Sequence, residues 1–420
     1  MRDSSDSRPT VGAAGGETVA PVGLNSPVPP RRTTYDFGKS AGSKQTGAGV
    51  LEMEEPEPDA RRITGESLWA VVLAGGIGSR FWPISSPRRP KPLLQLTSER
   101  PLIAETLRRL SPLVPAERVL VVTSADIADA IHAVIPEVPR RNLLVEPRPR
   151  GTAAALAWAT EEIIRRAGPD TIFCCVHADL AVGFPELFRA TLLRAARLAS
   201  MGQALVAIGV RASRAESAFG YLQRGARLRD DESLESGGGV RVTRFIEKPD
   251  ADEADRLVRG GALWNTGIFI WRAAVVREAL ESLTREVAPG LPALRANDHD
   301  AFVAGVQSVS IEHGLLERSD SIVAMLGDFE WDDVGTWASL RRARELDDRG
   351  NGAVGGVHFV ECTGNVVHSE EVGGDVVLYG VDGLLVVALD GLTFVTTMER
   401  AADLRPLLDA LPAHLRNRQA

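Results

Sequence analysis

The sequence has few cysteines, and their number and spacing do not suit a disulfide framework. Only Cys174, Cys175 and Cys362 occur in 420 residues, and the first two are adjacent within an apolar run. An odd number cannot all pair within one chain, and free cysteines of this kind usually act as small core residues. We therefore expect a cytoplasmic protein in a reducing compartment.

Long apolar runs and an excess of basic residues are also missing. No apolar stretch approaches the roughly 20 residues that cross a bilayer. The pair Arg31-Arg32 is followed by polar residues rather than by a hydrophobic region, which argues against a secretion signal. The net charge of −8 argues against a nucleic-acid-binding surface, which normally carries a basic excess. We expect neither a membrane nor a nucleic acid as partner.

The first 66 residues have almost no apolar periodicity. They are rich in Gly, Pro, Ser, Thr and charged residues, so they can bury too little apolar surface to offset the entropy of ordering. We expect residues 1–66 to form a disordered tail. The chain as a whole has ordinary globular values, with 25% charged and 44% hydrophobic residues.

Strands and helices alternate from Leu68 onward. The pattern predicts strands at 68–73, 118–123, 142–146 and 171–179, separated by helices at 102–110, 127–135 and 152–166. Apolar strands separated by helices are typical of a parallel sheet that is covered on both faces. We therefore predict an α/β fold with a Rossmann-like, mostly parallel sheet, which binds ligands beyond the carboxyl ends of its strands.

The second half of the sequence is less regular. It predicts strands at 204–210, 240–246, 264–271 and 321–326, with helices at 251–259 and 338–347. We expect the last of these helices to close a first folded domain at residues 67–347. Beyond Gly350, valines recur between Gly, Asp and Glu turns, as in short β-strands. Residues 348–420 are expected to form a small β-rich domain that ends in a helix at 401–411.

The most informative stretch is a strand that runs into a glycine loop. The apolar run at 68–73 is followed by Ala74-Gly75-Gly76-Ile77-Gly78-Ser79-Arg80. Glycine permits positive φ and a close approach of the backbone, and successive free N–H groups in such a turn bind anions. Arg80 and Lys91 add two positive charges, which suit a polyphosphate.

Two better-known glycine loops do not fit this stretch. A Walker loop ends in Gly-Lys-Ser/Thr, which this loop does not, and the dinucleotide fingerprint needs a third Gly or Ala where Phe81 stands. An ordinary strand-turn-helix with basic surface residues remains the simpler alternative.

The pattern Leu-Ala-Gly-Gly-x-Gly-x-Arg with Pro-Lys-Pro downstream resembles the signature of the sugar-phosphate nucleotidyltransferases, and within them the mannose-1-phosphate guanylyltransferases. The resemblance covers roughly residues 68–410. It implies that Lys91 acts at the α-phosphate and Arg80 at the leaving pyrophosphate, as the catalytic residues. The nucleotide-binding residues that it implies in the loop are Leu73, Ala74, Gly75, Gly76, Gly78, Ser79 and Arg80. It also implies that the C-terminal region is a small β-helical appendage, without the isomerase domain of longer bifunctional relatives.

Two aspartates match metal-binding motifs of that family. Asp179 follows a buried strand, and Asp333 stands between two tryptophans and before a glycine. Mg²⁺ usually takes only one or two protein carboxylates and completes its shell with phosphates and water. The resemblance implies that both aspartates bind Mg²⁺, whereas an isolated Asp after a strand more often makes a turn or a helix cap. The family usually has His where Leu180 stands. His177 lies two residues before Asp179, but a lone histidine on a strand is usually structural.

Further matches concern the sugar phosphate and the base. By resemblance, the sugar-phosphate-binding residues are Gly220, Glu247, Lys248 and Asn265, although Ala218-Phe219 replaces the usual Gly-Tyr. The base-reading segment is matched by Glu146, Arg150 and Thr152, with Gly151 in place of the usual Asn. A strand-end ion pair and an ordinary helix N-terminus are the structural alternatives for these two segments.

The resemblance implies a Mg²⁺-dependent enzyme that makes GDP-mannose and pyrophosphate from GTP and mannose-1-phosphate. In such a reaction the sugar phosphate attacks the α-phosphate in line. One alternative is a nucleotidyltransferase for another base or hexose, such as dTTP and glucose-1-phosphate. Another is a catalytically silent paralogue that binds a nucleotide sugar and regulates a partner. The sequence leaves the oligomeric state open, a homodimer included.

Overall fold

The computed structural model describes residues 67–75, 79–228, 238–370 and 374–416. The expected tail at 1–66 lies outside the described residues, and so do Gly76 and Gly78 of the glycine loop. The described residues all fall within Arg61–Ala420, which forms a single unit by its internal contacts. Among them, no helix is both long and apolar enough to cross a bilayer.

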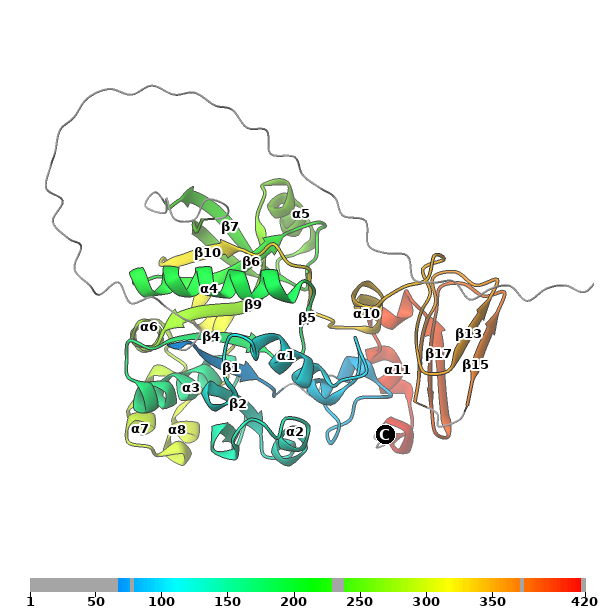
Figure 1. Cartoon of the computed structure of the whole chain (residues 1–420), viewed down its shortest axis with the longest axis horizontal. Coiled ribbons are helices and arrows are strands. Elements are labelled where there is room, and N and C mark those ends of the chain that lie inside the picture. Colours follow the sequence, from blue (N-terminus) through cyan, green and yellow to red (C-terminus); the bar gives the residue numbers. More distant parts are fainter. Residues whose placement is uncertain (1–66, 76–78, 229–237, 371–373, 417–420) are drawn as a thin grey trace, which may run out of the picture. The chain divides into compact units, whose positions relative to one another are not determined.

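A nine-stranded sheet with helices on both faces is the centre of the first part of the chain (Figure 1). Its strands lie in the order β3-β2-β1-β4-β9-β6-β10-β8-β7. The first four neighbours run parallel, namely β3 (Leu143–Glu146), β2 (Val119–Ser124), β1 (Trp69–Leu73) and β4 (Ile172–His177). Their continuous Val, Leu and Ile runs suit strands that are buried on both faces.

The other strands give the sheet a mixed second half. They are β9 (Leu263–Arg272), β6 (Leu205–Arg211), β10 (Ile322–Leu326), β8 (Val240–Glu247) and β7 (Gly220–Arg227). Strand β9 runs antiparallel to both β4 and β6, whereas β6 and β10 are parallel. The predicted α/β fold with its mostly parallel sheet is confirmed. The antiparallel direction of β9 was not foreseen, because a buried apolar run has the same pattern in either direction.

Strand β1 separates two hydrophobic cores, because successive side chains of a strand point to opposite faces. Ala70 and Val72 belong to one core, and Val71 and Leu73 belong to the other. The helices of the first core are α1 (Leu102–Leu110), α2 (Ala128–Val134), α4 (Pro185–Met201) and α5 (Ala251–Arg259). Those of the second are α3 (Thr152–Ala167), α6 (Ala273–Leu283), α7 (Leu291–Arg295), α8 (His299–Gly305) and α9 (Ile311–Gly314).

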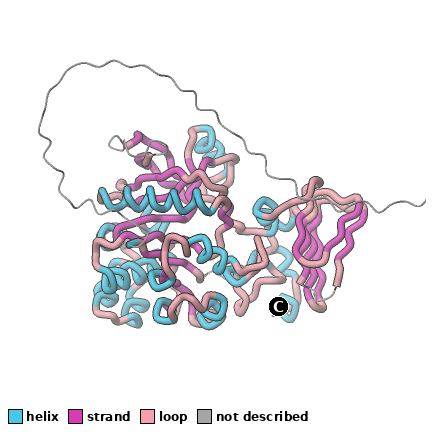
Figure 2. The backbone as a smooth tube through the Cα atoms, in the orientation of Figure 1, coloured by secondary structure: helices cyan, strands magenta, loops and turns pink. Residues whose placement is uncertain are grey.

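The C-terminal part consists of two small stacked sets of strands (Figure 2). In the first set, β12 (Gly352–Val354), β14 (Val366–Ser369) and β16 (Leu384–Leu389) are parallel, and β17 (Leu392–Thr397) is antiparallel to β16. In the second set, β13 (Val357–Val360) is parallel to β15 (Val376–Tyr379). Parallel strands that alternate between two sets are typical of a β-helix, so the β-helix-like fold expected here is confirmed.

Two predicted helices differ from those observed. The helix expected at 338–347 is α10 (Trp337–Ala343), which ends early because the next residue, Arg344, has an extended backbone and a buried side chain. The helix expected at 401–411 is confirmed only for its second half. A short 3₁₀ turn is followed by α11 (Arg405–Ala410) and α12 (Ala413–Arg416), and α11 carries a proline in its first turn. Proline lacks an N–H group and suits only the start of a helix.

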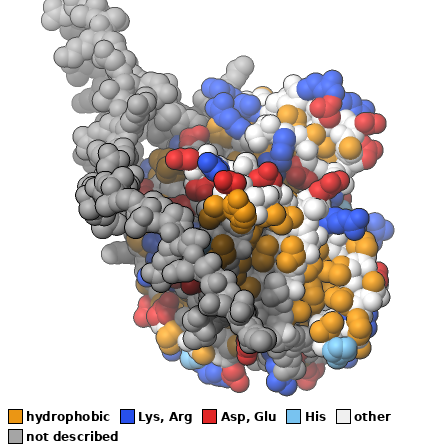
Figure 3. Space-filling model, turned by 90° about the vertical axis from the view of Figure 1, so that its right-hand side faces the viewer, with side chains coloured by type: hydrophobic (Ala, Val, Ile, Leu, Met, Phe, Trp, Pro, Cys, Tyr) orange, Lys and Arg blue, Asp and Glu red, His pale blue; other side chains and the backbone are white. Residues whose placement is uncertain are grey.

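A third hydrophobic core joins the two parts of the chain. It combines Phe81, Trp82 and Trp337 with Val366 and Leu385 of the C-terminal strands. The domain boundary expected between residues 347 and 348 therefore stays a prediction. Several large apolar side chains of the C-terminal strands are exposed, and hydrophobic groups gather on the face that Figure 3 views. The exposed side chains on these strands are Val360, Val377, Tyr379 and Val395.

Candidate active site

A short two-stranded ribbon brings the two predicted metal-binding aspartates together. It consists of β5 (Ala181–Val182) and β11 (Trp331–Asp332), which pair antiparallel. Ala181 lies opposite Asp332, so Asp179 and Asp333, at the outer flanks of the two strands, are brought to the same end of the ribbon. The pairing joins segments that are far apart in the sequence.

Lys91 connects these two aspartates. The residue is buried, with 6% exposed, and its Nζ lies 2.8 Å from Oδ2 of Asp179. The same Nζ donates a hydrogen bond to the backbone oxygen of Asp333 at 3.0 Å. Lys91 begins a short 3₁₀ turn between two prolines, which restrict the backbone on both sides of it. The lysine is therefore held in one position before any ligand arrives.

The two carboxylates of this cluster have opposite pKa shifts. Burial raises the pKa of Asp333, and the nearby carboxylate of Asp179 adds to the effect. Burial also favours the neutral form of Asp179, but the ammonium of Lys91 and the ring of His177 hold its pKa below the usual value. Two carboxylates crowded around one lysine repel each other, and a divalent cation would relieve that repulsion.

The donor set suits a small, hard cation. Within the described part of the chain, no group of three or more His, Cys, Asp or Glu side chains could hold a metal ion. Two carboxylates completed by ligand oxygens are a usual arrangement for Mg²⁺. The neighbouring Asp332 does not join this set, because its Oδ2 accepts a hydrogen bond from Nε of Arg342 at 2.8 Å.

The glycine loop ends beside the same carboxylates. Leu73 and Ala74 are buried, and the backbone of Ala74 donates to the oxygen of Val122 at 2.8 Å. Gly75 is exposed, and Ser79 begins a 3₁₀ turn that contains Arg80. A Cβ at Gly335 would lie 2.8 Å from Oδ2 of Asp333 and 3.7 Å from Nη1 of Arg80. The space beside Gly335 is therefore bordered by the side chains of Asp333 and Arg80.

The predicted sugar-phosphate residues also converge. A Cβ at Gly220 would lie 2.6 Å from Oε2 of Glu247 and 3.3 Å from Cβ of Asn265, so a side chain there would displace the Glu247 carboxylate. Nζ of Lys248 lies 2.6 Å from Oε1 of Glu247. Although burial favours its neutral form, the carboxylates of Glu247, Glu312 and Asp333 raise the pKa of Lys248. Asp333, one of the metal-binding candidates, is thus among the carboxylates that stabilise the charge of Lys248.

His177 lies between the predicted metal-binding aspartates and the predicted sugar-phosphate-binding residues. A Cβ at Gly267 would lie 3.1 Å from Cδ2 of His177, two residues after Asn265. His177 also lowers the pKa of Asp179 electrostatically. The histidine therefore borders both the aspartates and the sugar-phosphate residues, although no sequence motif singled it out.

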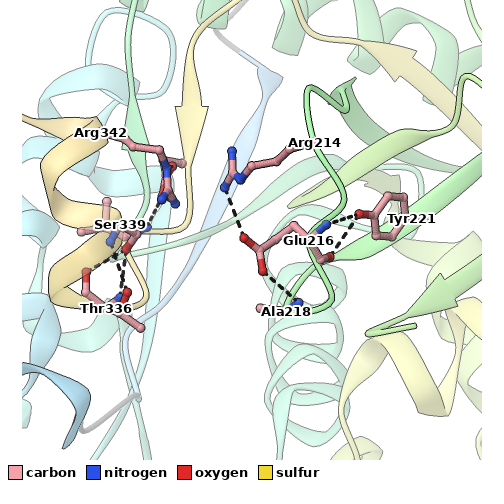
Figure 4. Close-up of polar contacts among 9 residues, drawn as sticks. Arg214, Glu216, Ala218, Tyr221, Thr336, Ser339 and Arg342 are labelled. Carbon is pink, nitrogen blue, oxygen red and sulfur yellow. Dashed lines mark hydrogen bonds and ion pairs between the residues drawn. The ribbon is translucent and has the colours of Figure 1, made fainter. Parts of the chain in front are cut away.

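Internal hydrogen bonds shape the loop before Gly220 (Figure 4). The hydroxyl of Tyr221 accepts from the backbone N–H of Glu216 at 2.9 Å and donates to its carbonyl at 3.1 Å. The guanidinium of Arg214 lies 4.9 Å from the ring centroid of Trp264. Across from this loop in Figure 4, Thr336 and Ser339 form the capping box of α10. A cavity of about 890 Å³ is lined by residues from both sides, among them Arg214 and Arg342.

The predicted base-reading residues are engaged within the protein. Glu146 is 9% exposed at the end of β3, and burial raises its pKa to about 7. Nε of Arg150 donates to the backbone oxygen of Val303 at 3.2 Å, and Oγ1 of Thr152 accepts from the N–H of Ile311 at 2.8 Å. Their contact with a base stays a prediction.

Sequence reasoning missed a carboxylate that holds Glu247. Oε1 of Glu317 accepts a hydrogen bond from the backbone N–H of Glu247 at 3.0 Å, and Oε2 lies 2.9 Å from Nδ1 of His313. The contact joins residues that are distant in sequence, so no local motif marks it. The only available signal was the i,i+4 spacing of His313 and Glu317, which is common on helices.

Comparisons with known proteins find similar sequences and a similar structure. The model of the nucleotidyl transferase family matches residues 69–349. The mannose-1-phosphate guanylyltransferase of Sinorhizobium fredii is 28% identical over 354 residues, which are 81% of this chain and 67% of that protein. The enzyme of the same name from Salmonella muenchen is 28% identical over 363 residues, covering 83% and 74%. The crystal structure of mannose-1-phosphate geranyltransferase from Thermus thermophilus superimposes with a TM-score of 0.74 at 32% identity, covering 82% of this chain and 98% of that one.

Proposed function

This chain belongs to the nucleotidyl transferase family, and on that premise we propose that it transfers a guanylyl group from GTP to mannose-1-phosphate. The products are GDP-mannose and pyrophosphate. The choice of these substrates is supported by relatives that are named mannose-1-phosphate guanylyltransferase and align with about four fifths of the chain. The three free, buried cysteines support a cytoplasmic location.

One observation carries the proposal. Lys91, Asp179 and Asp333 form a charged cluster. The carboxylate of Asp333 also helps to raise the pKa of Lys248, one of the predicted sugar-phosphate-binding residues. A polyphosphate bound at the cluster would therefore lie next to a sugar phosphate bound by Lys248. Nucleotidyl transfer requires this proximity, because the attacking and leaving oxygens must be aligned through one phosphorus atom.

Asp179 and Asp333 would hold Mg²⁺ together with phosphate oxygens. When bound, the ion would neutralise negative charge on the phosphates of the nucleotide. The protein groups provide the rest of the alignment. Lys248 and Glu247 would hold the sugar phosphate, while Gly220 and Asn265 form the wall beside them.

In the proposed reaction, a phosphate oxygen of the sugar phosphate attacks the α-phosphorus of GTP. The bond from that phosphorus to the bridging oxygen breaks, and the electron pair leaves with pyrophosphate. Lys91 would stabilise the charge at the α-phosphate, and Arg80 the charge on the leaving pyrophosphate. A phosphate nucleophile is already ionised at neutral pH, so His177 is not needed as a general base.

A second candidate is a nucleotidyltransferase with another base. It is favoured by Arg150, whose guanidinium donates to the carbonyl of Val303 rather than standing free for a nucleotide. The choice of base and of hexose therefore has to be measured together.

The test is release of pyrophosphate by the full chain with GTP, ATP, CTP, UTP or dTTP, each paired with mannose-1-phosphate or glucose-1-phosphate, with Mg²⁺ present. We expect the highest kcat/KM with GTP and mannose-1-phosphate. Release with dTTP alone would rule out the guanylyl assignment, and no release with any pair would rule out the enzyme.

Two variants complete the experiment. Asp333→Ala should lower kcat by about 100-fold or more, because it removes a charge that acts on the transition state. Asp332→Asn is the matched control, since Asp332 is paired with Arg342 and Asn keeps an acceptor for the N–H of Val334. Equal losses in both variants would mean that Asp333 has no special role.

A further inference from the structure

We propose that the C-terminal β part positions the catalytic lysine, with Glu370 holding Arg89 and, through Arg89, the loop that presents Lys91. The inference rests on the proposed function, in which Lys91 acts at the α-phosphate. It concerns residues that no motif marked, and it gives the C-terminal strands a part in the reaction. Glu370 and Arg89 are positioning residues, because the role assigned to them is exerted through Lys91.

The contact between the two parts is a bidentate ion pair. Nη1 of Arg89 lies 2.5 Å from Oε2 of Glu370, and Nη2 lies 2.8 Å from Oε1. About a quarter of each side chain is exposed. Two parallel hydrogen bonds between planar groups fix an orientation as well as a distance. The pair can therefore determine how the backbone at Arg89 is directed.

The carboxylate of Glu370 is also held by buried side chains. Oε1 accepts a hydrogen bond from Nε2 of His368 at 2.9 Å, and Nδ1 of His368 lies 3.0 Å from Nη2 of Arg344. Arginine can only donate, so Nδ1 accepts and the proton of the neutral ring is on Nε2. His368 is fully buried, and its ring packs edge to face with that of Trp337 at 5.7 Å between centroids. His368 and Arg344 thus fix the position of the Glu370 carboxylate that accepts from Arg89.

Arg344 also holds the backbone on the C-terminal side of Lys91. Its Nε donates to the carbonyl oxygen of Leu96 at 2.8 Å, within the buried core. Arg89 precedes Lys91 by two residues, and Leu96 follows it by five. The network therefore holds the lysine segment at both ends, through side chains that all meet at His368.

The segment is stiff enough to transmit this restraint. Ser86 and Arg89 exchange two backbone hydrogen bonds of 3.0 Å, which close a tight turn. Pro90 and Pro92 then restrict the chain on either side of Lys91. A displacement of Arg89 would move Nζ of Lys91 away from its partners Asp179 and Asp333. An error of about 1 Å at a catalytic group can cost on the order of 100-fold in rate.

The main test compares Glu370→Gln with the full-length wild-type protein in the pyrophosphate assay. Gln keeps the shape of the side chain but loses the charge that holds Arg89. We expect kcat to fall by about 10- to 100-fold while KM for both substrates changes by less than about threefold. The matched control is Glu281→Gln, which breaks a similar two-bond contact with Arg295 on a helix of the second core. The control should keep the wild-type kcat.

A second measurement separates positioning from general stability. Glu370→Gln is combined with Lys91→Arg, and the loss of kcat is compared with that of each single variant. If Glu370 acts through Lys91, the double variant loses much less than the product of the single losses. Multiplicative losses, or a wild-type kcat in Glu370→Gln alone, would overturn the proposal.

A third measurement does not depend on catalysis. The rate at which acetic anhydride modifies Lys91 is followed by mass spectrometry in the wild type and in Glu370→Gln. We expect faster modification of the variant, since its lysine leaves the carboxylates more often. Faster modification with no pyrophosphate release by the wild type would leave the positioning intact and defeat the proposed function. An unchanged rate would overturn the positioning itself.

Discussion

At the scale of single residues, the site combines fixed charges with one carboxyl that is poised near neutrality. Lys91, Asp179 and Asp333 are held by each other, so their positions are set before substrates bind. Glu146 differs because no cation among the described residues is paired with it, and burial raises its pKa to about 7. The end of β3 therefore carries a carboxyl that is half protonated at about neutral pH.

Glu146→Gln should change how stability depends on pH. The pKa of Glu146 is raised in the folded state. Between about pH 4.5 and 7, the native protein therefore keeps a proton on Glu146 that the unfolded chain has lost. Its contribution to stability is full below that window and is lost as the pH rises through it. The Gln variant should gain up to about 3 kcal/mol over the wild type at about pH 8 and little at about pH 4.

Urea unfolding across this pH range measures the effect. Glu105→Gln is a control of opposite sign. Burial opposes ionisation of Glu105, but hydrogen bonds from Arg108 and Ser98 hold its pKa below the usual value. The Glu105 variant should therefore lose stability relative to the wild type as the pH rises. A Glu146 variant whose difference from the wild type is the same at every pH would contradict the assignment.

At the scale of elements, the start of α3 explains a departure from the family pattern. Gly151, the residue before this helix, has a φ of +83°, and a Cβ there would lie 2.3 Å from the carbonyl oxygen of Val309. The family residue Asn would meet the same oxygen. The glycine is therefore required by the close approach of the segment before α9, and its presence says nothing about the base.

Gly151→Asn should destabilise the protein rather than restore a family contact. The side chain adds a steric clash with Val309 to the cost of a positive φ, each worth about 1–3 kcal/mol. Gly168→Ala at the other end of α3 is the matched control. Gly168 also has a positive φ, +95°, but apart from its chain neighbours no atom of the described residues lies within 4 Å of the added Cβ. Thermal unfolding that ranks the two substitutions equally would refute the steric explanation.

At the scale of the whole molecule, the two parts of the chain share a core. Trp82 packs edge to face with Phe394 at 5.2 Å, and Nε1 of Trp337 donates to the carbonyl of Trp82 at 3.0 Å. The ion pair between Arg89 and Glu370 crosses the same contact. The boundary expected after residue 347 thus separates two kinds of secondary structure, while the hydrophobic core continues across it.

Removal of residues 348–420 should lower the melting temperature by more than about 10 °C, because it exposes the apolar side chains around Trp82 and Trp337. Differential scanning calorimetry of the shortened chain measures this change. Removal of the chain from Ala413 onward is the control, since α12 has no buried residue. A shortened chain that melts like the wild type would establish residues 67–347 as an independent domain.

The sequence alone determined the family and local elements such as the helix at 102–110. The helix expected at 102–110 is confirmed residue for residue, because the spacing of its apolar residues and its flanking Pro101 act within a few residues. The resemblance to the nucleotidyltransferases, drawn from the motif around Gly75, is confirmed by the family match. Information of this kind is local, since backbone sterics and side-chain periodicity need no distant partner.

Only the tertiary structure decided how distant segments meet. The ribbon of β5 and β11 places Asp179 near Asp333, Glu317 holds the backbone of Glu247, and Glu370 reaches Arg89. Each contact joins segments whose own sequences do not specify the partner. Their pairing follows from how the sheet closes around its two cores, because strand direction and register are fixed by packing of the whole set of elements. The motifs therefore name the chemical groups, and the fold brings them to one place.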